Sequence, residues 1–339
     1  MVCATVAIRH PGFEGMDELT VHCCDPRERA GEIKDLFAQC GQSDFAPYFE
    51  RAYHARAEAG LRSWIGVADG NVVSHISVTP VEFGNGEYTL RGGILGDLQI
   101  AEGHRDFWTP VRLLRTMVAD IKRQEEIDFL LTTTTDEAEG IFKAGGFKVF
   151  GQLRRFVLPL FGPYVLWSRV RAGARSPLAD QLPLGADEVG QLLPTLTSNG
   201  AWRPLASPGF YATRVPKDGF VDGTWVTYAD RTGNRNAKRW ALVGHHESRP
   251  ESAVSDAFWD GDEAGLGEVL FAAARWSKDE RCTRMSISIL DDTVAARELV
   301  RCGFFPRSIR SRVLLQRIRG GELPGLKNWF LPGLAMSGW

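Results

Sequence analysis

The sequence lacks several features that mark specialised classes of protein. Its six cysteines include no C-x-x-C pair, which argues against zinc and predicts reduced thiols in a cytoplasmic protein. No apolar run is long enough to cross a bilayer, because Pro and Gly interrupt the longest one near the middle of the chain. The N-terminal residues lack the basic start and apolar core of a secretion signal. We therefore expect a cytoplasmic protein with no membrane segment and no metal.

The chain also lacks an excess of charge of one sign. A formal net charge of -2 over 339 residues argues against a nucleic-acid binder held by overall positive charge. Arginines nevertheless gather in two stretches, at Arg154, Arg155, Arg169, Arg171 and Arg175, and at Arg307, Arg310, Arg312, Arg317 and Arg319. Such stretches most often form a solvated face, and they could instead contact an RNA backbone.

One stretch, residues 96–147, has a clear order of elements. An apolar strand at residues 94–100 is followed by a polar turn and by a helix that has apolar residues at positions 111, 114, 117, 118 and 121. A strand at residues 127–131 and a short helix closed by Gly145-Gly146-Phe147 come next. The N-terminus of the first helix points beyond the end of the strand, which is a natural place for an anion.

The flanking sequence predicts the remaining elements of an α/β domain. We expect a strand at residues 19–22, helices from Asp25-Pro26 to Phe37 and over residues 45–59, and a hairpin over residues 64–78. Its tight turn is predicted at Gly70-Asn71. The run from Phe156 to Leu160 is expected to close the sheet.

The same landmarks occur twice along the chain. SWIGVAD from Ser63 resembles TWVTYAD from Thr224, and KAGGF resembles RCGFF. The paired positions are Asp69 and Asp230, Asp97 and Asp256, and Gly146 and Gly303, at offsets of 161, 159 and 157 residues. This order indicates two copies of one domain; the alternative is two unrelated α/β domains with chance matches.

The domain organisation follows from this repeat. We predict a lead-in (1–18), a first domain (19–167), a linker rich in Arg, Ser and Pro (168–184), a second domain (185–318) and a tail (319–339). The tail contains Trp329, Phe330, Leu331 and Trp339, which would be costly to expose. It is therefore expected to dock on a domain surface or on a partner.

In the order of its elements and in these landmarks, the chain resembles the GNAT superfamily, the Gcn5-related N-acetyltransferases, in a tandem arrangement. The resemblance implies an α/β (α+β) protein with two GNAT-like domains, each a mixed, mostly antiparallel sheet flanked by helices. In that family the sheet splays around its fourth strand and acyl-CoA lies in the splay. The loop after that strand, commonly R/Q-x-x-G-x-G/A, holds the pyrophosphate.

The loop matches the family only in part. In the first copy it falls on Arg105-Asp106-Phe107-Trp108-Thr109-Pro110, which keeps the base and lacks both glycines. In the second copy it falls on Asp262-Glu263-Ala264-Gly265-Leu266-Gly267, which keeps both glycines and has an acid at the first position. The tyrosine that often protonates the departing thiolate maps to Phe142 and Val300. In the second copy, Asp262 and Glu263 would place negative charges beside a negatively charged pyrophosphate, which is unfavourable. We therefore place the ligand in the first copy.

The resemblance and the chemistry of amine acylation together give a set of site residues. An amine must be neutral to attack, so a carboxylate or imidazole near the end of the central strand is useful. The predicted catalytic residues are Asp97, Glu102 and His104, and the predicted donor-binding residues are Leu98, Gln99, Ile100, Arg105, Thr109, Pro110, Thr133, Gly265 and Gly267. The recurrence of Asp97 at Asp256 favours a structural role for both. His75 either faces the acceptor or is a core histidine, and Cys302 is predicted to be a packed thiol.

Three functions are consistent with these residues. The first is an acyltransferase that moves an acyl group, expected to be acetyl, from acetyl-CoA or another acyl-CoA to a small-molecule amine. The second is an aminoacyl-tRNA-dependent transferase like the Fem-type ligases, with tRNA as its partner. The third is a non-catalytic GNAT-like binding protein. The chain is expected to be a monomer or a homodimer.

Overall fold

A computed structural model gives the structure of the chain. It describes residues 19–42, 49, 53–54, 56–161, 183–184, 201–205, 222–227, 240–245, 250–259 and 264–332. The predicted lead-in, most of the predicted linker, and the last residues of the tail, including Trp339, lie outside the described residues. Within the described part, no helix is long and apolar enough to cross a membrane.

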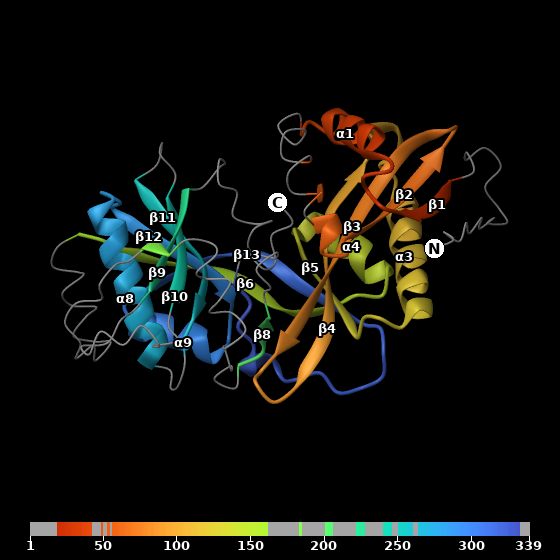
Figure 1. Cartoon of the computed structure of the whole chain (residues 1–339). Helices are drawn as coiled ribbons and strands as arrows, with labels where there is room; N and C mark the ends of the chain where they lie inside the picture. The colour runs from red at the N-terminus through yellow and green to blue at the C-terminus, as the bar shows by residue number, and fades with distance from the viewer. Residues whose placement is uncertain are drawn as a thin grey trace.

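The first half of the molecule runs from β1 to β6 (Figure 1). Its elements are β1 (Thr20–Cys24), α1 (Ala30–Gln39), β2 (Arg62–Ala68), β3 (Asn71–Gly84), β4 (Thr89–Ile100), the 3-10 turn η1 (Glu102–His104), α3 (Trp108–Gln124), β5 (Phe129–Thr134), α4 (Asp136–Ala144) and β6 (Lys148–Pro159). The order predicted for residues 96–147 is confirmed.

Two local predictions for the first half need correction. The hairpin turn lies at Asp69-Gly70, one residue earlier than predicted, because these two residues adopt the positive φ angles, 50° and 78°, of a tight hairpin turn. The first helix begins at Ala30, not at Asp25-Pro26. Asp25 instead accepts a hydrogen bond from the backbone N–H of Arg27 (2.9 Å) and closes a turn.

The second half runs from β7 to β13, and from β9 onward it repeats the order that starts at β2 in the first half. Its elements are β7 (Pro183–Leu184), β8 (Arg203–Pro204), β9 (Asp222–Thr227), β10 (Trp240–His245), β11 (Glu251–Phe258), α8 (Ala264–Asp279), β12 (Arg284–Leu290), α9 (Val294–Arg301), β13 (Phe305–Arg317) and the 3-10 turn η3 (Leu326–Asn328). Gly146 and Gly303, which the repeat aligns, follow α4 and α9 with φ angles of 99° and 91°. Both glycines end their helix in the left-handed conformation.

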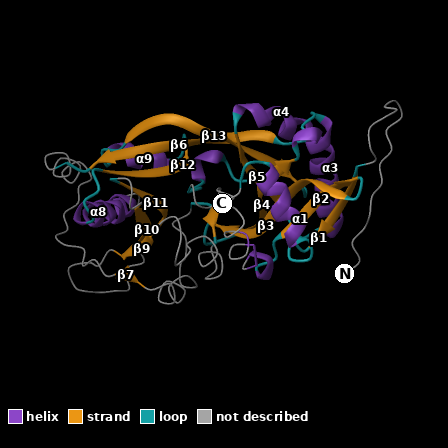
Figure 2. Cartoon of the chain, turned by 90° about the horizontal axis from the view of Figure 1, so that it is seen from above, coloured by secondary structure: helices purple, strands orange, loops and turns teal. Residues whose placement is uncertain are grey.

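The two halves exchange their last strands in one continuous sheet. The strand order is β1-β2-β3-β4-β5-β13-β6-β12-β11-β10-β9-β7, and β8 pairs with β3. Strand β13 therefore lies between β5 and β6, while β6 lies between β13 and β12. Figures 1 and 2 show these two long strands crossing the middle of the molecule side by side. Residues 156–160 thus pair with the second half and do not close the first half's sheet alone.

Three hydrophobic clusters form the core. One lies between the first-half strands and the helices α1, α3 and α4, and a second lies between the second-half strands and the helices α8 and α9. The third joins the two halves, and its centre is Trp329, which is 1% exposed. The ring of Trp329 contacts Phe83, Phe129 and Trp202. The described part of the tail therefore packs against both halves and completes this cluster, in keeping with the docking that its apolar residues predicted.

Candidate functional site

The two central strands of the first half separate at a defined point. The parallel pairing of β4 with β5 begins at Gly92 and Phe129 and ends at Ile94 and Leu131. Beyond it, β4 continues on β3, and β5 continues on β13. The remaining residues of β4, from position 95 to position 100, thus present one backbone edge toward the diverging strand β5. Such an edge offers hydrogen-bonding groups to a ligand.

A β-bulge in β4 follows directly after this point. Gly96 pairs with Ser77 and Gln99 pairs with His75, so two residues of β4 oppose one residue of β3. The first of them, Asp97, has a left-handed backbone conformation with φ 59°. That conformation is unfavourable for a residue other than glycine, so the surrounding contacts must hold it.

The carboxylate of Asp97 is held in a buried polar cluster. Its Oδ2 atom accepts a hydrogen bond from the Tyr53 hydroxyl (2.6 Å) and lies 3.0 Å from the hydroxyl of Ser77. Arg56 Nη1 lies 3.7 Å from the same oxygen, and the two side chains are 2% and 4% exposed. Burial raises the pKa of Tyr53 well above its usual value, and the Asp97 carboxylate raises it further, so Tyr53 remains a neutral donor.

His75 holds the backbone of the same bulge. Its Nδ1 donates a hydrogen bond to the carbonyl of Asp97 (2.9 Å), and its Nε2 lies 3.0 Å from the Ser63 hydroxyl. Since a carbonyl can only accept, Nδ1 carries the proton and the neutral ring accepts from Ser63. Burial lowers the pKa of His75, although its bond to the Asp97 carbonyl acts in the opposite direction. His75 is therefore a core histidine, the second of the two roles considered for it.

The other two predicted catalytic residues lie in η1, beyond the end of β4. Glu102 is exposed and His104 is half-buried, so solvent reaches both side chains. Arg105 Nε donates to the carbonyl of Ile100 (3.1 Å), and Cys40 Sγ lies 3.3 Å from that carbonyl. The structure therefore places Glu102 and His104 together at the surface, while the carboxylate of Asp97 is buried.

The N-terminus of α3 binds a carboxylate of its own chain. Asp106 accepts hydrogen bonds from the backbone N–H of Trp108 (2.6 Å) and from the backbone N–H and hydroxyl of Thr109 (2.8 and 2.7 Å). This is the geometry of a helix N-cap. Burial alone would raise the pKa of Asp106, but these hydrogen bonds hold it below its usual value. Thr109 and Pro110 are buried in the first turn.

Two further positions, Thr133 and Phe142, correspond to residues expected to contact the pantetheine arm of the donor and its leaving thiolate. Thr133 lies on β5, half-buried, and pairs with Val313 of β13. Phe142, at the position of the expected tyrosine, is 4% exposed and packs its ring edge-to-face on Phe147. The corresponding residue of the second half, Val300, is 45% exposed. Neither side chain can donate a proton.

In the second half the corresponding strands β11 and β12 separate in the same way, and side chains of the protein itself contact the edge of β11. The parallel pairing of β11 with β12 ends at Val254 and Ile287, and a bulge precedes Asp256. Arg203 Nη2 lies 3.2 Å from the Asp256 carboxylate, and Nη1 donates to the carbonyl of Ala257 (3.0 Å). Three rings, those of Trp240, Phe258 and Phe330, surround the same guanidinium.

The glycines of the second-half loop lie inside the helix. Gly265 and Gly267 are buried in the first turn of α8. Residues 260–263, which include Asp262 and Glu263, lie outside the described residues. The predicted donor-binding glycines therefore lie on α8, in the other half of the molecule from Arg105 and Thr109 (Figure 1).

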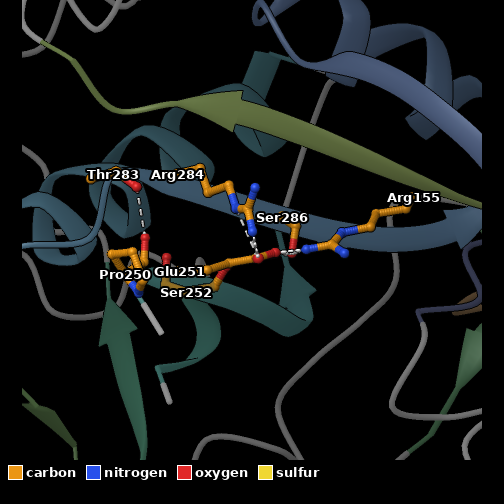
Figure 3. Close-up of polar contacts among 7 residues, drawn as sticks. All are labelled: Arg155, Pro250, Glu251, Ser252, Thr283, Arg284 and Ser286. Carbon is orange, nitrogen blue, oxygen red and sulfur yellow. Dashed lines mark hydrogen bonds and ion pairs between the residues drawn. The ribbon is translucent and has the colours of Figure 1, made fainter. Parts of the chain in front are cut away.

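Several of the clustered arginines form ion pairs within the chain. Figure 3 shows the carboxylate of Glu251 (β11) between Arg155 (β6) and Arg284 (β12). The Ser286 hydroxyl donates to the same carboxylate (3.0 Å). Further pairs are Arg154 with Asp291, Arg312 with Glu139, and Arg319 with Glu125. Most of these ion pairs join the first half to the second, and all of them reduce the positive charge available to a nucleic acid.

The other candidate sites in the described part of the chain offer fewer groups that could bind or react with a ligand. A cavity of about 200 Å³ lies between α3 and the opposite end of the strands, lined by Trp64, Val78 and Pro80 among others. Across its rim Arg62 already binds Glu126 (2.7 Å). No cluster of metal-ligating side chains occurs in the part of the chain that the structure describes. Burial raises the pKa of Cys302 to about 12, which fits the packed thiol that was predicted.

Sequence reasoning missed most of the groups that hold the bulge. The roles of Tyr53, Arg56 and Ser77 toward Asp97 depend on tertiary contacts, and no sequence pattern marks them. The cap by Asp106 has a local signal, since an Asp precedes Thr109 by three residues at the start of an apolar helix.

No family model matches the chain, and no curated protein matches it in sequence. Solved structures do match. A conserved protein from Enterococcus faecalis V583 has a TM-score of 0.65 at 10% identity, over 88% of this chain and 73% of that chain. A GCN5-related N-acetyltransferase from Anabaena variabilis has a TM-score of 0.64 at 10% identity, over the same shares.

A tandem protein is among these matches. A tandem GNAT protein from the clavulanic acid biosynthesis pathway has a TM-score of 0.55 at 13% identity, over 90% of this chain and 100% of that chain. At these identities the likeness establishes the fold. The chain has the GNAT fold, with two GNAT-like halves, as the resemblance implied.

Proposed function

From this fold, we propose that the chain is an N-acyltransferase that works in the cytoplasm. It moves an acyl group from a pantetheine thioester, the chemistry of acetyl-CoA and other acyl-CoA donors, to the amine of a small molecule. The first half holds the reacting groups. One observation carries the proposal. In the first half the diverging edge of β4 follows a bulge held by a dedicated buried cluster, whereas in the second half the Arg203 guanidinium, beside Phe330, already binds the Ala257 carbonyl of the equivalent strand β11.

The backbone of β4 would bind the donor. Leu98, Gln99 and Ile100 are half-buried and lie on the strand beyond its last contact with β5. Their N–H groups that point toward the diverging strand are suited to the thioester carbonyl, whose oxygen gains negative charge during attack. Asp97 acts as a positioning residue here, since its carboxylate is occupied by Tyr53, Ser77 and Arg56.

The acceptor amine would be deprotonated near the end of β4. Glu102 and His104 are the accessible titratable side chains of η1, and either can take the proton directly or through water. The amine nitrogen then forms a bond to the carbonyl carbon and the carbon–sulfur bond breaks. Because Phe142 cannot donate a proton, the thiolate would be protonated by solvent or by the proton taken from the amine.

Amine-dependent thiol release tests this function. The full chain is mixed with acetyl-CoA and a panel of amines, and free thiol is measured with a thiol-reactive dye. We expect release that needs an amine, and a fall of roughly 100-fold or more in Glu102→Gln or His104→Asn, whichever is the base. Glu87→Gln, an exposed turn residue, is the matched control.

A non-catalytic binding protein is the second candidate, because Phe142 is buried where a proton donor is expected. Thioester binding without release for any amine would favour it over the transferase. Equal release by the parent, Glu102→Gln and His104→Asn would contradict the roles given to η1.

A further inference from the structure

Helix α3 presents a positively charged outer face. Its basic residues are Arg112, Arg115, Lys122 and Arg123, and its one acid is Asp120. The Asp120 side chain is 8% exposed, pairs with Arg123 and accepts a hydrogen bond from Trp64 (3.0 Å). Asp120 thus offsets Arg123 alone, and no carboxylate of α3 is exposed beside Arg112, Arg115 and Lys122. Arg115 Nη2 donates to the carbonyl of Ala144 (3.0 Å), a neutral acceptor that leaves its charge in place. An acidic partner would therefore be attracted along the helix.

Two exposed aromatic rings lie at the start of the same helix. Phe107 and Trp108 are 47% and 52% exposed, and their rings pack edge-to-face with centroids 5.3 Å apart. Trp108, Arg112 and Arg115 follow at i, i+4 and i+7, so they lie along one helix face. Exposed aromatic side chains next to arginines are typical of protein docking surfaces.

The same helix end does not fit a diphosphate. The N–H groups of Trp108 and Thr109, which could receive an anion, already bind the Asp106 carboxylate. A diphosphate would have to displace this carboxylate or lie beside it, and like charges at that distance repel. Trp108 also replaces the glycine that would let a backbone approach phosphate closely.

We propose that the acyl donor is the pantetheine arm of an acidic acyl carrier protein, which docks on Phe107, Trp108 and the cationic face of α3. The arm enters between the diverging strands β4 and β5. Such a donor has no nucleoside diphosphate, so no diphosphate has to lie beside the Asp106 carboxylate. The inference rests on the proposed acyl transfer. In the step, the amine nitrogen bonds to the thioester carbon, the carbon–sulfur bond breaks, and the carrier's thiol takes up the proton that the amine loses.

A carrier protein fits this surface better than a tRNA. Helix α3 has 17 residues, about 25 Å, which matches one helix of a small protein. A tRNA would need a wider basic surface. Arg154, Arg155 and Arg312, which could have supplied it, are paired with Asp291, Glu251 and Glu139.

Binding of donor fragments tests the exclusion of the diphosphate. Calorimetric titration of the full chain with CoA, with 4′-phosphopantetheine and with adenosine 3′,5′-bisphosphate should give affinities for the first two within about threefold, and no binding of the third. CoA binding tenfold or more tighter than 4′-phosphopantetheine would overturn the inference and leave the acyltransferase intact. Failure of every pantetheine compound to bind would overturn the proposed function as well.

The Asp106→Asn variant removes the negative charge and keeps the helix cap, because asparagine also caps helices. We expect this variant to bind CoA at least ~5-fold more tightly than the parent, as one repelling charge is removed. Its affinity for pantetheine, which carries no phosphate, should not change. Unchanged affinity for CoA, with a thermal midpoint equal to that of the parent, would contradict the role given to Asp106.

Docking is tested with an acetyl-loaded bacterial acyl carrier protein. Transfer from it should exceed transfer from acetyl-CoA at equal concentration, weaken with added salt, and fall at least ~5-fold in Arg112→Glu. Arg275→Glu, on the corresponding helix α8, is the matched control and should behave as the parent. Equal effects of the two variants, preference for acetyl-CoA, or transfer only from an aminoacyl-tRNA would each overturn the inference.

Discussion

The hydroxyl of Tyr53 donates a hydrogen bond of 2.6 Å to Oδ2 of Asp97, across 44 residues of sequence. This contact ties the bulge of the central strand to the helical residues 53–54 and 56–58. Arg56, from the same segment, supplies the opposite charge. The left-handed backbone at Asp97 is therefore held by side chains that the strand itself does not contain.

Replacing Tyr53 by phenylalanine should destabilise the protein by about 1–3 kcal/mol, since a buried carboxylate loses a donor. Chemical denaturation followed by fluorescence measures the change. Tyr88→Phe, at a residue that is 67% exposed, is the control and should change stability by less than about 0.5 kcal/mol. If both variants unfold at the same denaturant concentration, the Tyr53–Asp97 contact does not stabilise the fold.

Stability should fall as the pH drops from 7 toward 5, in part because of His75. Burial lowers the pKa of native His75 below the value of 6.5 that an unfolded histidine has. The unfolded chain therefore binds the proton first, and the contribution is at most about 1.4 kcal/mol per pH unit. His75→Gln should reduce this slope in denaturation curves taken across the pH range.

The control for His75 is a variant that loses stability without losing a titratable group. Ile76→Val, at the next buried position of β3, serves this purpose. It should keep the slope of the parent. A slope in His75→Gln as steep as in Ile76→Val would exclude His75 as a source of the pH dependence.

Trp329→Ala should be among the most destabilising single changes, by about 3–5 kcal/mol. The ring fills the third core cluster, where it contacts Phe83, Phe129 and Trp202 from both halves. Trp108→Ala removes an equally large side chain that is 52% exposed, and thermal unfolding should barely change. Comparable losses from the two variants would mean that the tail does not complete the core.

The strand exchange predicts that the halves depend on each other. Expressed alone, residues 1–167 lack β13, which lies between β5 and β6, so they should not unfold cooperatively. Co-expression with residues 168–339 should restore a folded complex that purifies together. A cooperative transition of residues 1–167 alone, at the midpoint of the full chain, would contradict this dependence.

Local order was predictable from the sequence, and long-range pairing was not. The helix α3 and the glycines Gly146 and Gly303 follow from periodicity and from the conformation that glycine permits. The exchange of β6 and β13 could not be predicted, because either strand can complete either half and a sequence pattern does not specify the partner of a strand. The same limit applies to Asp97, whose neighbours Tyr53 and Ser77 are distant in sequence.

The candidate site was likewise predictable from the sequence only in part. Glu102, His104 and Arg105 lie at the end of the central strand, where the predicted order of elements puts them. The occupied helix start at Asp106 is a local cap, which a sequence can signal. The filling of the second half by Arg203 and Phe330 needs segments about 50 and 70 residues away from Asp256 to meet, and only the tertiary structure reveals it.

Hydrogen exchange of the full chain, with and without a hydrolysis-resistant acyl-pantetheine analogue, tests the central claim most directly. Peptides that cover residues 95–100 of β4 should gain protection when the analogue binds. Peptides that cover residues 255–258 of β11, the equivalent edge of the second half, should not change. Protection confined to β11, or absent from both edges under saturating analogue, would contradict the placement of the acyl-transfer site in the first half.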